Sequence, residues 1–154
     1  MLIAPGAAVL FTVALWPAPG GTQSPSRSTW SGVYSPAQAD RGLQLYFSTC
    51  SQCHGPDMTG IDSAPPLIGG RFAANWNGVT LGDMVERIRI SMPQNKPGSL
   101  TRAEIADVTA YLLQQNGFPA GESELPRQTS VLRTIAYEAY GPDRQRDHLN
   151  TLPE

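Results

Sequence analysis

The first segment with helical periodicity follows a clear start signal. Ser35 can cap a helix, Pro36 suits its first turn, and Gln38 stands three residues after the cap. Apolar residues then recur at i, i+3, i+4 and i+7, which predicts one buried helical face: Leu43, Tyr46, Phe47 and Cys50. Gly42 weakens this helix by about 1 kcal/mol relative to Ala. A close crossing with a second helix would explain the glycine, since no side chain then separates the two backbones.

Two further segments show the same period. Thr80, three residues before Asp83, predicts the start of a helix over residues 80–91, with an apolar face made by Leu81, Met84, Val85 and Ile88. Thr101 and Glu104 form a capping box, after which the apolar stripe continues and a stop signal follows: Ile105, Val108 and Leu112, then Asn116-Gly117. No alternating strand pattern stands out. We therefore expect a mainly α fold.

The segment Cys50-Ser51-Gln52-Cys53-His54 carries the most specific chemistry in the chain. Two thiols on one helical turn can each add to a vinyl group of a single haem, and the histidine then binds the iron. A disulfide would leave His54 unexplained, a zinc site would need four ligands, and a thioredoxin-like pair would need a flanking strand–helix–strand pattern. Cys50 and Cys53 are the only cysteines. The motif therefore predicts covalent attachment of one haem c.

A second axial ligand is expected, and methionine in that place raises the reduction potential. Of the four methionines, Met1 is the initiator. Met58 lies only one turn past the motif, which is too close for it to reach the other face of the haem. Met84 belongs to the apolar face of the predicted helix over residues 80–91, so core packing explains it. Met92 precedes a proline in a segment with loop character, which leaves its thioether free to face the iron. We favour Met92 as the distal ligand, with Met84 as the alternative.

With these residues in place, the chain resembles the small mono-haem class I cytochromes c. The likeness covers roughly residues 35–120 and rests on residues before, after and opposite the haem motif: Gly42 and Tyr46, Pro65-Pro66-Leu67-Ile68-Gly69, Met92-Pro93 and Tyr111-Leu112. It implies a small cytochrome c-like fold of three to five helices wrapped around one covalent haem. Residues 99–108 and 116–119 look closest to the cytochrome modules that accompany quinoprotein alcohol dehydrogenases.

The resemblance also implies roles for individual residues. In that family, a loop proline, Pro65 here, accepts a hydrogen bond through its carbonyl from the proximal histidine, here His54. The stretch between residues 69 and 80 often supplies donors to the haem propionates, which makes Arg71 and Trp76 candidates. Arg71 is explained equally well as a solvated charge, and Trp76 as a core or surface aromatic.

The chain divides into four expected regions. Residues 1–21 are uncharged and include an apolar run shorter than the ~20 residues that span a bilayer. No Lys or Arg precedes that run, which departs from the usual signal-peptide pattern. The length of the run and the small residues after it still lead us to expect an export signal, with a retained membrane anchor as the alternative. Residues 22–34, rich in Ser, Thr, Pro and Gly, predict a flexible linker. Residues 35–120 form the cytochrome c domain.

The tail over residues 121–154 has helical spacing at Val131, Leu132, Ile135 and Ala139, so a short helix there can dock, bind a partner or fray.

Charge constrains the partner weakly, because the formal net charge is −2 and the basic residues are scattered. Arg87, Arg89, Lys96 and Arg102 could gather into a basic patch, but an ordinary solvated surface is the preferred interpretation. Nothing resembles a nucleic-acid site, which would show a basic excess with interleaved aromatics.

We therefore expect an electron carrier rather than an enzyme, exported to the periplasm or a comparable compartment. Its partners would be redox proteins, such as a quinoprotein dehydrogenase or a terminal oxidase, with membrane association through the N-terminus as a possibility. Two alternatives stay open. One is a ligand-binding or catalytic haem protein with a five-coordinate iron. The other is a fixed cytochrome subunit of a larger redox complex.

Overall fold

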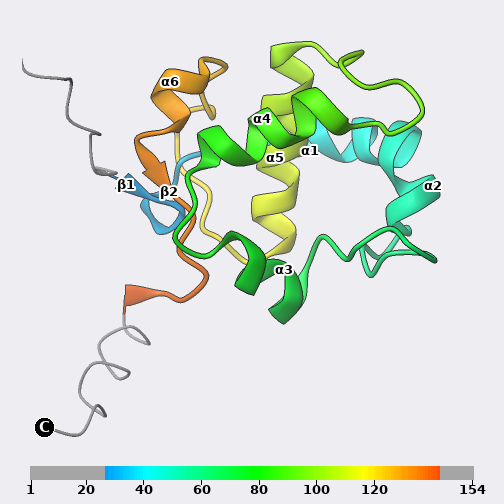
Figure 1. Cartoon of the computed structure of the whole chain (residues 1–154). Coiled ribbons are helices and arrows are strands. Elements are labelled where there is room, and N and C mark those ends of the chain that lie inside the picture. Colours follow the sequence, from blue (N-terminus) through cyan, green and yellow to red (C-terminus); the bar gives the residue numbers. More distant parts are fainter. Residues whose placement is uncertain (1–26, 143–154) are drawn as a thin grey trace, which may run out of the picture.

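The computed structural model describes residues 27–142, and the predicted mainly helical fold is confirmed there (Figure 1). Helix α5 runs through the centre of the molecule, with α1 and α4 against it. The elements follow in chain order: β1 (Arg27–Ser28), the 3-10 turn η1 (Thr29–Ser31), α1 (Pro36–Leu45), the π-helical turn η2 (Tyr46–Cys50), α2 (Ser51–His54), α3 (Gly69–Trp76), α4 (Leu81–Ser91), α5 (Arg102–Gln115), α6 (Thr129–Leu132) and β2 (Ile135–Ala136).

Helices α1 and α5 cross at the glycine that the sequence singled out. A Cβ atom on Gly42 would lie 2.0 Å from the carbonyl oxygen of Asp107 and 2.8 Å from the Cβ atom of Tyr111. The expected close helix crossing is therefore confirmed. Beside it, the Arg41 guanidinium pairs with Asp107 at 2.9 Å and with Glu124 at 2.8 Å, which joins α1 to α5 and to the segment after it.

Helices α4 and α5 begin as predicted. The Thr80 side chain accepts a hydrogen bond from the backbone N–H of Asp83, and the capping box of Thr101 and Glu104 is present. The predicted apolar faces lie in the core, with Ile88 half-buried and the others buried: Leu81, Met84 and Val85 on α4, and Ile105, Val108 and Leu112 on α5. Local capping and periodicity thus account for both helices.

The segment before the haem motif does not form the one continuous helical face that the sequence predicted. Helix α1 ends at Leu45, and the π-helical turn η2 follows, in which the Ser51 N–H donates to the Tyr46 carbonyl. A π turn closes over one more residue than an α turn, so it rotates the positions that follow. Tyr46 is consequently fully buried while Phe47 is 49% exposed, and the prediction that Phe47 lies on the buried face is wrong.

The described part of the expected linker packs on the domain. Val33 and Tyr34 are buried in the main core, and the Tyr34 hydroxyl donates a 2.8 Å hydrogen bond to the Phe118 carbonyl. The Trp30 indole N–H donates to the Glu138 carbonyl at 2.8 Å. Residues 27–34 are therefore packed on the domain and are not a flexible linker. Burial of their apolar side chains stabilises this packing, although the Ser- and Gly-rich composition predicted flexibility. The rest of the expected linker and the expected signal or anchor, residues 1–26, lie outside the described residues.

The C-terminal segment also belongs to the folded unit. Its buried side chains join the main core: Leu125, Leu132, Ile135 and Tyr137. Of the three possibilities for the tail, docking on the domain is the one observed. The possible helix is limited to the single turn α6, because Ile135 instead enters β2, which pairs in parallel with β1. Neither this two-residue strand pair nor α3 was predicted, and residues 143–154 lie outside the description.

No helix within residues 27–142 is both long and apolar enough to cross a membrane.

Replacing Gly42 with Ala should lower the free energy of unfolding by about 1–3 kcal/mol, because the added methyl group would force α1 away from α5. The opposing gain in helix propensity is only about 1 kcal/mol. Denaturant unfolding monitored by circular dichroism measures the effect. Gly70→Ala in α3 is the matched control, since nothing lies within 4 Å of the Cβ it would add. Equal stability of the two variants would contradict the close crossing.

Gln38→Ala should loosen the C-terminal segment. The buried Gln38 amide donates to the Leu125 carbonyl at 3.1 Å and accepts from the Leu125 N–H at 2.6 Å. Truncation leaves both backbone groups unpaired, at a cost of about 1–3 kcal/mol. Hydrogen exchange should rise over residues 121–142 with little change in α4. A rise in hydrogen exchange that is uniform across the domain would contradict the role of Gln38 as a local clamp on Leu125.

Candidate haem site

The two cysteines and the histidine of the motif lie on consecutive turns after α1. Cys50 ends the π-helical turn η2 and is half-buried, whereas Cys53 and His54 belong to α2. Cys53 is exposed and His54 is only 7% exposed. No disulfide joins the two thiols. The turn therefore presents two thiols close to a largely buried imidazole.

The imidazole of His54 is held by the loop that follows it. Its Nδ1 lies 2.9 Å from the Pro65 carbonyl oxygen, which is the contact that the family resemblance implied. A carbonyl can only accept, so Nδ1 carries the proton and donates. Nε2 is then the nitrogen with a lone pair, which is the form of imidazole that binds a metal.

Backbone hydrogen bonds fold residues 55–68 back onto the motif. The Gly60 N–H donates to the His54 carbonyl at 2.9 Å, and the Ile61 N–H donates to the Cys53 carbonyl at 3.1 Å. The buried Tyr46 hydroxyl donates to the carbonyl of Gly55, directly after the motif. Burial raises the pKa of Tyr46, with the nearby Cys50 adding to the effect, so this hydroxyl remains a donor at neutral pH. The loop is thereby tied to α2 at several points.

The environment of Cys50 argues against a thiol redox pair. Burial, with a smaller contribution from the neighbouring Cys53, raises the pKa of Cys50 to about 11. Reactive thiolates and zinc-binding thiolates have lowered pKa values instead. Among residues 27–142, no three His, Cys, Asp or Glu side chains are grouped so as to hold a metal ion. A protonated, partly buried thiol beside a histidine fits thioether formation with a haem.

An apolar cluster adjoins the motif, and some of its side chains are only half-buried. Its buried members come from η2, the motif loop and α5: Tyr46, Met58, Val108, Tyr111 and Leu112. Half-buried side chains packed against them include Cys50, Leu67, Ile68 and Ile88. A haem is a large apolar disc with polar propionates, so this half-buried apolar surface next to two thiols and an imidazole fits the group.

The methionines occupy different environments. Met84 is 2% exposed and packs in the main core, as its helical position predicted. Met92 is half-buried and forms the C-cap of α4 in extended conformation, where the helix gives way to a loop. Helix α2 and the C-terminal end of α4 lie on the same side of α5 in Figure 1. Met58 is buried in the cluster beside the motif.

Arg71 and Trp76 both lie on α3. Arg71 is exposed, and Trp76 is half-buried against the main core, with its ring centroid 6.2 Å from that of Phe72. Within the described residues, neither side chain makes a hydrogen bond to His54 or to either cysteine. Their assignment to the haem propionates remains a prediction.

Asn116 is a residue whose part in the site the sequence did not reveal. Its side-chain amide donates to the Leu67 carbonyl at 2.9 Å and to the Leu112 carbonyl at 2.8 Å. This bridge holds the proline-rich loop against the end of α5. The only signal in the sequence was the role of Asn116 as a helix stop.

Comparisons with known proteins identify the domain. Residues 37–112 match the family described as cytochrome C oxidase, cbb3-type, subunit III. The chain is 32% identical over 105 residues to the thiosulfate dehydrogenase of Stutzerimonas stutzeri (strain A1501), a match that covers 62% of this chain and 34% of that protein. The chain thus spans about a third of the length of this relative.

Among solved structures, the sulfane dehydrogenase SoxCD from Paracoccus pantotrophus aligns with a TM-score of 0.48 and 22% identity, over 81% of this chain and 72% of that chain. The resemblance to modules of quinoprotein alcohol dehydrogenases stays a prediction.

The family match runs from α1 into α5 and contains the whole haem motif. Within that range lie the helical fold, the paired thiols and the imidazole, and a cytochrome c domain implies haem c and haem-based electron transfer. Residues 37–112 are thus a domain of the cytochrome c family.

Proposed function

We propose that this protein carries single electrons through one haem c, attached by thioether bonds to Cys50 and Cys53. His54 would be the proximal ligand and Met92 the distal ligand. The observation that carries the proposal is the imidazole of His54, whose Nδ1 is engaged by the Pro65 carbonyl at 2.9 Å. That contact orients Nε2 and makes it a better donor to iron.

The residues of the chain would hold and shield the group. The bound haem supplies an iron that alternates between the ferrous and ferric states. Leu67, Ile68 and Ile88 would cover its apolar faces and exclude water, which favours the less charged state of the iron. The Tyr46 hydroxyl and the Asn116 amide would keep the surrounding loop rigid, so that little reorganisation accompanies each electron transfer.

An exported redox protein is the proposed partner. Cytochrome c domains are usually exported, and the named relative is a thiosulfate dehydrogenase. This name favours a role as the cytochrome component of a dehydrogenase over a freely diffusing carrier. A quinoprotein dehydrogenase or a terminal oxidase is a further candidate partner. A five-coordinate, ligand-binding haem protein is disfavoured, because the chain offers Met92 on a loop at the end of α4.

Attachment of the haem can be tested by mass. Protein produced with a cytochrome c maturation system should carry the added mass of one haem after denaturation, together with a c-type absorption spectrum. Cys53→Ser should keep one thioether at most, and the double change Cys50→Ser with Cys53→Ser should release the haem into organic solvent. Retention of the added mass in the double variant would rule out the proposed attachment.

Met92→Ala should lower the reduction potential and open the iron to carbon monoxide, because a vacant axial position admits exogenous ligands. The unmodified protein should show a reduced spectrum that carbon monoxide does not shift. Redox titration and difference spectroscopy measure the two effects.

Met84→Leu is the matched control for this test. Met84 is buried in the main core, so a substitution of similar volume there should cost less than about 1.5 kcal/mol and leave the spectrum unchanged. An unchanged potential in Met92→Ala, combined with carbon monoxide binding in Met84→Leu, would transfer the distal role to Met84.

A further inference from the structure

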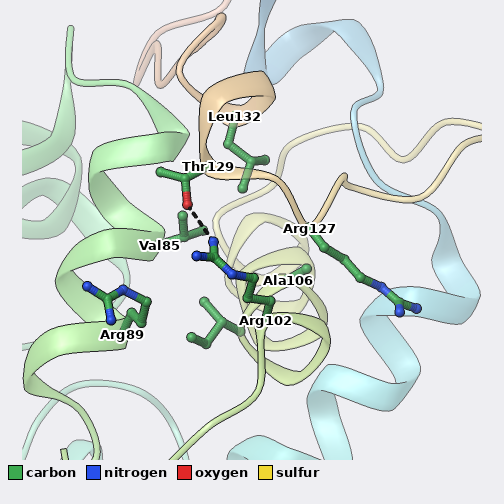
Figure 2. A pocket seen from close by; sticks show the side chains of 8 residues that line it. Val85, Arg89, Arg102, Ala106, Arg127, Thr129 and Leu132 are labelled. Carbon is green, nitrogen blue, oxygen red and sulfur yellow. Dashed lines mark hydrogen bonds between the residues drawn. The ribbon is translucent and has the colours of Figure 1, made fainter. Parts of the chain in front are cut away.

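Two adjoining hollows lie among α4, the start of α5 and the segment around α6. Figure 2 shows the side chains that line the smaller one. Neither is lined by a residue of the haem motif. The larger, open hollow is lined by four arginines and one carboxylate: Arg89, Arg102, Arg127, Arg133 and Glu86. We call these four arginines the arginine rim. With one Glu among them, the charged lining has a formal charge of +3 (4 − 1), in a chain whose net charge is −2.

Half of the arginine rim is already paired within the domain. Arg89 donates to Glu86 from Nε at 2.9 Å, and Arg133 lies 3.7 Å from Asp83. The hydrogen bond from Arg89 lowers the pKa of Glu86, and Arg102 and Arg133 add to that effect. No carboxylate of the described residues lies within 4 Å of the guanidinium of Arg102 or Arg127. These two groups are therefore the available positive charges.

The geometry of the arginine rim limits what it can bind. Arg102 donates to the Thr129 hydroxyl at 3.1 Å, while Arg89 and Arg127 extend away from it in opposite directions (Figure 2). Guanidinium groups that diverge cannot converge on one small anion, whereas they suit several carboxylates spaced along a chain. Beneath them lie the buried side chains of Val85, Ile105 and Leu132.

Packing fixes this surface. A Cβ atom on Gly82 would lie 2.3 Å from Cγ of Arg133 and 2.9 Å from the Thr129 carbonyl oxygen, so α6 is pressed directly against α4. The segment carrying Arg127 and Arg133 is held in place by the buried Leu132 between them. Charges up to 44 residues apart in sequence thus share one face of the domain.

We propose that the arginine rim is a docking surface for an acidic segment of a partner protein. Carboxylates spaced along that segment pair with Arg102 and Arg127. No aromatic side chain lines either hollow, and this absence disfavours a nucleic acid. In Figure 1, α6 and α2 lie on opposite sides of α5, so the part of this surface around α6 lies apart from the haem motif. The proposal is independent of which residue is the distal iron ligand.

The test measures binding of a fluorescein-labelled decaglutamate peptide to the holoprotein by fluorescence anisotropy, at an ionic strength of about 0.01 M. Arg127→Glu and Arg102→Glu should each weaken binding about threefold or more, because each replaces an attraction with a repulsion. The double variant should bind more weakly than either one. Adding salt to about 0.15 M should weaken binding to the unmodified protein.

Arg87→Glu is the matched control, since it makes the same change of charge on α4 outside both hollows. It should bind decaglutamate nearly as well as the unmodified protein, and all variants should keep the same haem spectrum and reduction potential. Equal weakening in Arg87→Glu would show general attraction to a basic surface and would overturn the proposal. Saturable binding of inorganic sulfate that Arg127→Glu abolishes, without binding of the peptide, would assign the hollow to a small anion and would overturn it as well.

Discussion

The contact between α1 and α5 at Gly42 is the constraint on which the other elements depend. The two backbones meet so closely that a Cβ atom would lie 2.0 Å from the Asp107 carbonyl oxygen. This contact sets the direction in which the chain leaves α1. The π-helical turn η2 and the haem motif follow directly, so their position relative to α5 is fixed by the same crossing. Buried Tyr46 and Tyr111 pack against each other beside it, with ring centroids 5.5 Å apart.

Around that crossing, the buried apolar side chains of the domain form two clusters. The larger cluster is closed by both ends of the described chain, since Tyr34 and Tyr137 are each only 1% exposed within it. The smaller cluster has Cys50 packed against it and includes other half-buried side chains. A rigid core next to a half-buried apolar surface is a suitable scaffold for a large flat cofactor, because the cofactor's apolar faces need cover and the core needs no rearrangement to provide it.

The packing of residues 121–142 on the domain completes the surface that carries the arginine rim. The Gln38 amide clamps Leu125, and α6 presses on α4 at Gly82. The same packing that completes the main core also brings Arg127 and Arg133 beside Arg89 and Arg102. In Figure 1 the haem motif around α2 and the tail part of the arginine rim around α6 lie on different sides of α5, whereas Arg89 lies near the end of α4.

Local interactions explain what the sequence alone determined. The caps at Ser35, Thr80 and Thr101, the apolar period of α4 and α5, and the spacing of Cys50, Cys53 and His54 all act over a few residues, so they can be read directly. The π-helical turn that exposes Phe47 and the ordering of residues 27–34 depended on contacts with distant segments. So did the arginine rim, whose members come from α4, α5 and the tail. Only the tertiary structure decided these features, because burial against a partner more than eighty residues away, as for Tyr34 and Phe118, leaves no periodic signal in the sequence around either residue.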